Sequence, residues 1–475
     1  DQGPHLLSHS LALEKLFRLD DAIQFAEKAM ARMPNNPEAY KHLAFCEIRV
    51  SRADRAVRTL RMAARMFADD LVIQSNLLYC ENYIEQPDVD LFRKHLDYQT
   101  HLNSRGIIPK KILPRKSSRL RLGLVSGDFR KHSVSYFVRP WLKHVDRSRF
   151  EMVLIDTSST QDDVTEEFRT MADEWIAAGQ LQDEPFAEVL RSRELDVVCD
   201  LSGHTQGNRL SALASRCAPL QATLIGAMQT TGLSEMDIRF TDHWMDPPGT
   251  TESQHTEHLI RLTNGGWIFE APPDMPEVQP LPAMKNGFIT FGSFNNTAKI
   301  SEEVLDTWAG ILGHVPNSRL LLNGFHFPTI RDALVKRGVD AGRLEFIGRP
   351  AGQAYYAQHH RVDIALDTFP FNGLTVTCFA AWMGVPTLSH AENRPASRVG
   401  YAIANRLGIA DTVIAPSRGA LIDQAVKLCS DWTTLSKIRF SLRQRSKEGL
   451  TNHGAWVQEI SAALTATSAK HLPQG

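Results

Sequence analysis

Small and apolar residues recur at a fixed spacing over the first 86 residues. An offset of 34 residues pairs Asp20 with Asp54, Ala22 with Ala56, Ala29 with Ala63, Leu43 with Leu77, Cys46 with Cys80 and Glu47 with Glu81. This is the period of tetratricopeptide repeats, in which small residues stand where antiparallel helices approach closely. The pattern predicts tetratricopeptide-like repeats over residues 1–86. They serve either as a helical scaffold or as a surface that binds an acceptor.

A helical pattern continues beyond the repeats and ends in a basic segment. Residues 109–122 read PKKILPRKSSRLRL and carry six Lys or Arg side chains among prolines and serines. Basic side chains in such a segment are usually solvated between domains, although they are also able to contact phosphate. Residues 87–118 are therefore predicted to be a helical connector and a basic linker.

From residue 119 onward, short β-rich runs alternate with helical stretches. The first set is LRLGLVSG, FEMVLID, LDVVCDLSG and ATLIGAM, and the second is FITFGSF, SRLLLNGF, LEFIG, VDIALDTFP and VPTLSH. Alternation of this kind is typical of doubly wound parallel sheets. A proline-rich stretch at residues 271–282 separates the sets. We expect two Rossmann-like α/β domains, at 119–275 and 276–475, with ligands bound at the carboxyl ends of the strands.

Composition narrows the class of protein. The 475 residues include 53 Lys and Arg against 54 Asp and Glu, a net charge of -1, so no global field favours nucleic acid as a partner. No apolar run approaches the roughly 20 residues that a membrane span needs. The six cysteines include no CxxC pair, which favours reduced thiols and a cytoplasmic protein.

Several common catalytic signatures are absent from the sequence. It has no GxxxxGK[ST] loop, HExxH, GxSxG elbow or GxGxxG after a first strand. His255 and His258 are three residues apart, and His359 and His360 are adjacent, but neither pair has a third ligand at a persuasive spacing. No metal site and no cofactor are predicted.

Two histidines follow predicted strands of the first Rossmann-like domain. His132 lies in GDFRKHSVSYF, residues 127–137, and His204 lies in DLSGHTQGN, residues 200–208. An imidazole at the carboxyl end of a strand can exchange a proton near neutral pH. A lone histidine at such a position is as often structural, so the sequence leaves both roles open.

Two loops of the second Rossmann-like domain suit phosphate. FGSFNNTAKI, residues 291–300, places Lys299 just before a helix, where an ammonium and a helix N-terminus together can hold a diphosphate. LDTFPFNGLTVTCF, residues 366–379, has a turn through Asn372 before Thr375 and Thr377 open a helix. Free N–H groups and hydroxyls there also suit phosphate oxygens. Either loop taken alone is better explained as a capped helix.

These motifs, in this order, resemble the SPINDLY and O-linked N-acetylglucosamine transferase family. The resemblance covers nearly the whole chain, and the blocks that carry it are GDFRKHSVSYF, DLSGHTQGNRL, TTGLSEMDIRFTD, ITFGSFNNTAKIS, VDIALDTFPFNG and ASRVG. The resemblance implies tetratricopeptide repeats joined to a two-domain GT-B glycosyltransferase. It also implies inverting, metal-independent transfer of a sugar from a nucleotide diphosphate to Ser or Thr hydroxyls of proteins.

The resemblance also implies roles for individual residues. Lys299 would neutralise the leaving diphosphate, Asn296 would contact it, and the turn of Asn372, Thr375 and Thr377 would bind its oxygens. Tyr355 falls where the family places a ring near the base, and Arg398 of ASRVG would support the same end of the cleft. His132 and His204 are candidates for the general base or for positioning the acceptor.

The sequence departs from the family pattern at two places. Leu374, Val376 and Phe379 occupy positions where threonines and an acidic ribose-binding residue are usual, and residues 224–229 read LIGAMQ where the family has a Trp-Leu-Gly-Tyr-Pro-Gly block. These changes bear on ribose recognition and on the choice of sugar donor or acceptor.

Three functions remain open at this point. The first is transfer of N-acetylglucosamine from UDP-N-acetylglucosamine, and the second is transfer of fucose from GDP-fucose, which the SPINDLY-like HSVSYF block supports. The third is a catalytically impaired scaffold, motivated by Phe379. The expected partners are a nucleotide sugar and a protein or peptide acceptor held by the repeats, and a homo-oligomer is compatible with stacked repeats.

Overall fold

The structure is a computed structural model that describes residues 2–115, 117–324, 327–348 and 350–471. The chain divides into two compact units. The first joins Asp1–Glu85 to Pro273–Lys447, and the second joins Gln86–Pro272 to Glu448–Gly475. Among the described helices, none has the length and apolar character that a bilayer crossing requires.

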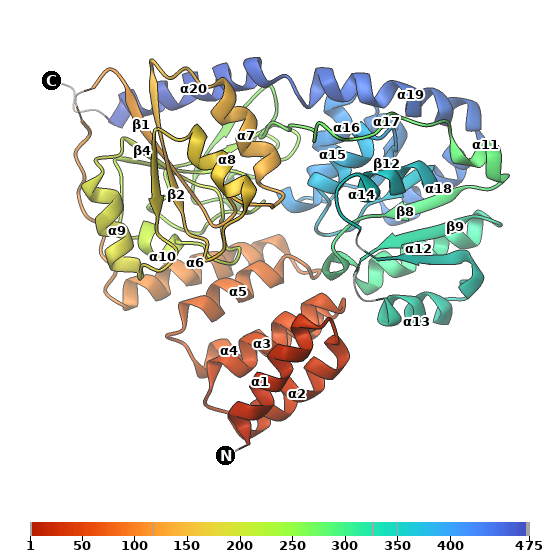
Figure 1. Cartoon of the computed structure of the whole chain (residues 1–475), viewed down its shortest axis with the longest axis horizontal. Coiled ribbons are helices and arrows are strands. Elements are labelled where there is room, and N and C mark those ends of the chain that lie inside the picture. The colour runs from red at the N-terminus through yellow and green to blue at the C-terminus, as the bar shows by residue number, and fades with distance from the viewer. Residues whose placement is uncertain (1, 116, 325–326, 349, 472–475) are drawn as a thin grey trace. The chain divides into compact units, whose positions relative to one another are not determined.

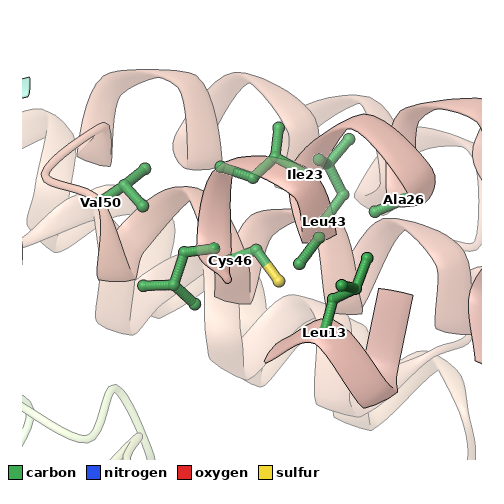
Figure 2. Close-up of a cluster of buried hydrophobic side chains, with 8 residues drawn as sticks. Leu13, Ile23, Ala26, Leu43, Cys46 and Val50 are labelled. Carbon is green, nitrogen blue, oxygen red and sulfur yellow. The ribbon is translucent and has the colours of Figure 1, made fainter. Parts of the chain in front are cut away.

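The first unit begins with five antiparallel helices, drawn in red and orange in Figure 1. They are α1 (Gly3–Lys15), α2 (Leu19–Arg32), α3 (Pro37–Arg49), α4 (Ala53–Met66) and α5 (Leu71–Glu81). Asn36 caps α3 by accepting a bond from the Glu38 N–H, and Asp70 caps α5. Ala22, Ala26 and Cys46 are fully buried between the first helices, in the cluster that Figure 2 shows. The predicted repeat packing is thus present.

The first unit also contains a six-stranded parallel sheet in the order β10-β9-β8-β11-β12-β13. Its strands are β8 (Thr290–Ser293), β9 (Arg319–Asn323), β10 (Leu344–Ile347), β11 (Ile364–Leu366), β12 (Thr387–His390) and β13 (Ile414–Ala415). The strands read as short apolar runs because helices cover both faces of such a sheet.

The helices of this part of the first unit connect or flank its strands. The α-helices are α11 (Pro282–Asn286), α12 (Glu302–His314), α13 (Pro328–Lys336), α14 (Gln353–Ala357), α15 (Thr375–Trp382), α16 (Val399–Arg406), α17 (Ala410–Val413), α18 (Arg418–Ser430) and α19 (Trp432–Gly449). The 3₁₀ turns are η2 (Thr297–Lys299), η3 (Ala341–Arg343), η4 (Gln358–Arg361) and η5 (Pro395–Ser397).

The repeats pack directly on the loops of this six-stranded sheet. The Ser51 hydroxyl donates to the Thr297 carbonyl at 2.8 Å, and the Arg394 guanidinium donates to the Ile84 carbonyl at 3.3 Å. Arg418 forms an ion pair with Glu85. These contacts join segments more than 200 residues apart in the chain, and they explain why the repeats share a compact unit with residues 273–447.

The second unit is built on a seven-stranded parallel sheet in the order β3-β2-β1-β4-β5-β6-β7. Its strands are β1 (Leu120–Ser126), β2 (Phe150–Asp156), β3 (Glu174–Ala177), β4 (Val197–Asp200), β5 (Leu220–Thr223), β6 (Ile238–Thr241) and β7 (His258–Arg261). Gly123 lies at a close approach in this sheet, since a Cβ there would meet Leu195 Cδ1 at 2.7 Å. The remaining elements between strands are α7 (Ser135–His144), α8 (Asp163–Met171), α9 (Asp183–Ser192), α10 (Leu210–Leu213) and η1 (Glu252–Gln254).

Two helices from outside the 119–275 range complete the second unit. Helix α6 (Asp88–Ser104) packs on the loop after β5, where a Cβ on Gly232 would meet the His95 carbonyl oxygen at 2.4 Å. Helix α20 (His453–His471) returns from the end of the chain, and Trp456 Nε1 donates to the Gly265 carbonyl at 2.8 Å. Both helices therefore belong to the same compact unit as the seven-stranded sheet.

Candidate functional site

Lys299 lies at the end of η2, directly after β8. Its ammonium donates to the Asn372 carbonyl at 2.7 Å and lies 4.1 Å from the centroid of the Phe371 ring. Burial lowers the pKa of Lys299 to about 8, while the Asp367 carboxylate acts in the opposite direction. The side chain is therefore a cation at neutral pH, held on one carbonyl and one aromatic face.

Asp367 organises the loop that carries Phe371 and Asn372. It follows β11 and is 2% exposed. Its Oδ1 accepts from the Gly373 N–H at 2.8 Å, and its Oδ2 accepts from the Ser389 hydroxyl at 2.8 Å. Burial raises the pKa of Asp367, and the hydrogen bonds that it accepts oppose this effect. The carboxylate thus fixes the turn in front of α15.

The side chain of Asn372 stabilises the same turn. Its Nδ2 donates to the Thr368 carbonyl at 2.7 Å, and its Oδ1 accepts from the Gly400 N–H at 3.1 Å. Its main-chain carbonyl is the acceptor for Lys299. The predicted contact of Asn372 with a nucleotide sugar stays a prediction, and in this structure the residue positions Lys299.

Helix α15 begins beside this turn. In the described part of the chain, no hydrogen bond engages the Thr375 hydroxyl or the N–H groups of Thr375 and Val376. The Thr377 hydroxyl donates to the Gly373 carbonyl at 2.9 Å, so its hydrogen is committed within the helix. Unpaired N–H groups at a helix start attract anions. Thr375 is better placed than Thr377 to donate to a phosphate oxygen.

Tyr355 belongs to an aromatic cluster of the same unit. Its ring packs edge-on against Phe294, His359 and Phe379, with centroid distances of 5.9, 5.7 and 6.2 Å. Phe379 is 6% exposed and also packs on Tyr356. Phe379 therefore fills apolar space at the position where the sequence comparison expected a ribose-binding carboxylate.

Asn296 and Arg398 are both tied to local structure. The exposed Asn296 caps η2 by accepting a bond from the Ala298 N–H at 3.1 Å. Arg398 precedes α16, donates to the Glu392 carbonyl at 3.0 Å and lies over the Tyr401 ring. Their predicted contacts with the nucleotide sugar stay predictions.

Replacing Gly373 with alanine is expected to destabilise the chain by about 1–3 kcal/mol. The new Cβ would meet Asn295 Oδ1 at 2.5 Å and Val376 Cγ2 at 2.6 Å, which forces the turn before α15 to shift. Chemical denaturation measures the change. Gly419→Ala in α18 is the matched control because its Cβ meets nothing within 4 Å. Equal stability of the two variants would show that the turn tolerates a side chain.

In the second unit, His132 lies exposed after β1, beside an acidic partner. Its Nδ1 is 3.3 Å from Oδ2 of Asp128, and the imidazole is 40% exposed. The loop is stabilised by the Ser135 hydroxyl, which donates to the His132 carbonyl at 2.7 Å. The Val134 N–H donates to the same Nδ1 at 3.4 Å, so Asp128 and Val134 compete for this atom. Only the tautomer with hydrogen on Nδ1 donates to Asp128 and leaves Nε2 as the ring atom that can take a proton. His132 and Asp128 thus form a pair suited to general base catalysis.

His204 follows β4 and is only 2% exposed. Its Nε2 is 3.0 Å from the Thr231 carbonyl, an acceptor, so Nε2 carries the hydrogen. Burial lowers the pKa of His204 to about 4, which keeps the imidazole neutral at pH 7. The sequence placed both histidines at strand ends, but only His132 has an exposed ring.

Helix α6 supplies two side chains that the sequence reasoning missed. His95 and Tyr98 pack on the His204 ring, each with centroids 5.1 Å from it. Burial lowers the pKa of His95 well below its usual value. The two residues are three positions apart and therefore share one helix face. The spacing of His95 and Tyr98 was the signal that the sequence offered. It was missed because this helix was interpreted only as a connector.

A buried ionic network holds the loop after β5. Glu257 accepts from the Thr231 N–H at 2.6 Å, and His255 Nε2 is 2.9 Å from Asp246 Oδ1. Hydrogen bonds and the field of His255 lower the pKa of Glu257 to about 2, despite its burial. Arg239 donates to the Gln229 carbonyl at 2.8 Å, which fixes the divergent 224–229 segment.

Among the residues that the structure describes, no group of three or more His, Cys, Asp and Glu side chains is arranged to hold a metal ion. His255 contacts two carboxylates, whereas the neighbouring His258 is exposed at the start of β7.

Comparison with known proteins identifies the family. Glycosyl transferase family 41 matches residues 99–271 and 281–460, and a tetratricopeptide repeat family matches residues 15–78. A protein of Solanum lycopersicum named "Probable UDP-N-acetylglucosamine--peptide N-acetylglucosaminyltransferase SPINDLY" is 34% identical over 82% of this chain. Its namesake from Arabidopsis thaliana is 35% identical over 78%. The chain spans 43% and 42% of these two relatives.

A solved structure extends the match to the whole fold. A mutant of the Thermobaculum terrenum O-GlcNAc transferase matches with a TM-score of 0.93 and 28% identity, over 99% of this chain and 91% of that one. The predicted family and the predicted fold class, repeats followed by a GT-B pair of parallel sheets, are confirmed. The chain belongs to glycosyl transferase family 41.

Proposed function

We propose that this protein transfers N-acetylglucosamine from UDP-N-acetylglucosamine to Ser or Thr hydroxyls of protein acceptors, with inversion and without a metal. Family membership supports glycosyl transfer, and the names of the plant relatives support this sugar and a peptide acceptor. The observation that carries the proposal is the Lys299 ammonium, held 2.7 Å from the Asn372 carbonyl in the turn before α15.

Sugar transfer develops negative charge on the leaving diphosphate, and Lys299 and the start of α15 are suited to stabilise that charge. As the bond between the anomeric carbon and the diphosphate breaks, the electron pair leaves on the diphosphate oxygen. The Lys299 cation and the first N–H groups of α15 stabilise that charge without reorganising. In this proposal they supply the electrostatic role that a metal ion plays in other transferases.

The acceptor hydroxyl needs a base as it attacks. Its oxygen bonds to the anomeric carbon on the face opposite the leaving group, which inverts the configuration, and its proton passes to an imidazole. His132 is the stronger candidate because it is 40% exposed and its Nδ1 faces Asp128, whereas His204 is buried. The acceptor itself is proposed to be recognised by the repeats.

A transfer assay tests the proposal. Labelled UDP-N-acetylglucosamine and GDP-fucose are offered in EDTA with a library of Ser- and Thr-containing peptides. We expect label on the peptides from UDP-N-acetylglucosamine, with a β-linked product from the α-linked donor. Transfer from GDP-fucose alone would replace the proposed sugar. No transfer and no hydrolysis of either compound would favour the scaffold interpretation.

Nucleotide affinity is expected to fall as the pH rises through about 8, the pKa to which burial brings Lys299. Below that pH the side chain is an ammonium that attracts the diphosphate, and above it the amine is neutral. Between pH 7 and pH 9 the affinity for UDP should drop by about tenfold. Calorimetric titration with UDP measures this change. The same drop in Lys299→Ala would assign the effect to another group.

A further inference from the structure

The Phe371 ring is shared between Lys299 and the repeats. Lys299 Nζ lies 4.1 Å from the ring centroid, and the ring of Tyr83 packs against the same side chain with centroids 5.5 Å apart. Tyr83 follows α5 and is 3% exposed. A buried apolar cluster of Ala53, Tyr83 and Ala298, with Phe371 packed on it, joins the two regions.

Hydrogen bonds from the repeats fix η2 itself, the turn that ends at Lys299. The Ser51 hydroxyl donates to the Thr297 carbonyl at 2.8 Å, and the Thr297 hydroxyl donates to the Arg49 carbonyl at 3.4 Å. Thr297 is 7% exposed, so these bonds are shielded from water. Both the backbone of Lys299 and the aromatic face under its ammonium are therefore braced from the same side.

We infer that the repeat region is a positioning element of the diphosphate site, in which Tyr83 acts through Phe371 to hold the Lys299 ammonium. The identification of a diphosphate as the ligand of this site rests on the proposed function. The inference gives the repeats a role in binding the sugar donor, separate from any role in binding the acceptor. In this inference Tyr83 acts only through Phe371 and does not bind the nucleotide itself.

The physical basis is the flexibility of lysine. A lysine side chain has four rotatable bonds, and holding its ammonium in one place costs entropy unless contacts fix it. A cation over an aromatic face gains about 0.5–2 kcal/mol, more when water is excluded. Tyr83 keeps the Phe371 ring in place and water away from it, so the cation is positioned before the nucleotide arrives.

Tyr83→Ala removes the brace and leaves every group around the ammonium intact. Tyr83→Phe is the conservative variant, since it keeps the ring and loses only the bond to the Tyr79 hydroxyl at 2.9 Å. Tyr40→Ala is the matched control. Tyr40 is also 3% exposed, but it packs on Phe67 within the repeats. Both alanine variants therefore lose a buried repeat ring, and only one loses the contact with Phe371.

The first measurement is calorimetric binding of UDP to the whole chain, after thermal melts have shown that each variant is folded. Tyr83→Ala should bind UDP roughly 3- to 30-fold more weakly than Tyr40→Ala, the range that the loss of a held cation allows. Tyr83→Phe should bind like the wild type. Equal weakening in the two alanine variants would overturn the inference.

The second measurement needs no nucleotide and separates this inference from the proposed function. The pH dependence of Lys299 acylation, followed by mass spectrometry of its peptide, reports the pKa of the amine. Burial lowers this pKa to about 8, and Asp367 is the charged group that opposes the shift. Tyr83→Ala should move it toward 10.5 by admitting water, and Tyr40→Ala should not. An unchanged pKa in Tyr83→Ala contradicts the brace even if the wild type binds no UDP.

Discussion

Replacing Lys299 with alanine is expected to lower kcat by about 10²- to 10³-fold, the cost of losing one preorganised group that stabilises a developing anion. The ammonium is held on the Asn372 carbonyl and the Phe371 ring, in a place where burial strengthens its field. Steady-state kinetics with saturating sugar donor measures the loss, which should fall on kcat and on UDP affinity together.

Two further variants separate charge from packing. Lys299→Met keeps an unbranched side chain at this position without its charge and should be nearly as impaired as the alanine variant. Lys285→Ala removes an exposed cation of α11 and should turn over at the wild-type rate. Near-native turnover of Lys299→Ala would remove this lysine from the mechanism.

The second large effect is expected at His132. His132→Ala should lower kcat by roughly 10²- to 10⁴-fold, the usual contribution of a positioned general base. Asp128→Asn should have a smaller effect in the same direction, because Asp128 orients the imidazole from 3.3 Å. UDP affinity should stay at the wild-type value, since the diphosphate half-site is built from residues of the other compact unit.

His258→Ala provides the matched control, because it removes an exposed imidazole at the start of β7 in the same unit as His132. It should leave kcat unchanged. If His132→Ala weakens UDP binding as strongly as turnover, the histidine supports the fold or the nucleotide site and is not the base.

Hydrophobic periodicity was sufficient to predict the architecture, because repeats and parallel strands have short, regular patterns. The strand LRLGLVS and the 34-residue offset both describe local packing that each segment carries in its own sequence. The division into compact units was not accessible in this way. It depends on contacts such as Arg418 with Glu85 and Trp456 with Gly265, which no local pattern contains.

The same limit applies to the site. Lys299 was predicted because an ammonium just before a helix N-terminus is suited to hold a diphosphate, and this pattern is visible in the sequence. The structure adds its neighbours Phe371 and Asn372. Asn296 caps its own turn and the Thr377 hydroxyl bonds within α15, because short polar side chains satisfy nearby backbone first. His95 gave no signal beyond its helical spacing, since only tertiary packing places it against His204.

We propose that Lys299 and the start of α15 bind the diphosphate of a sugar nucleotide. Calorimetry with UDP, UDP-N-acetylglucosamine, GDP and GDP-fucose in EDTA, on the wild type and on Lys299→Ala, tests it most directly. We expect micromolar binding of the uridine compounds, weakened strongly by the substitution. Absence of binding by all four, or equal binding by the two proteins, would contradict it.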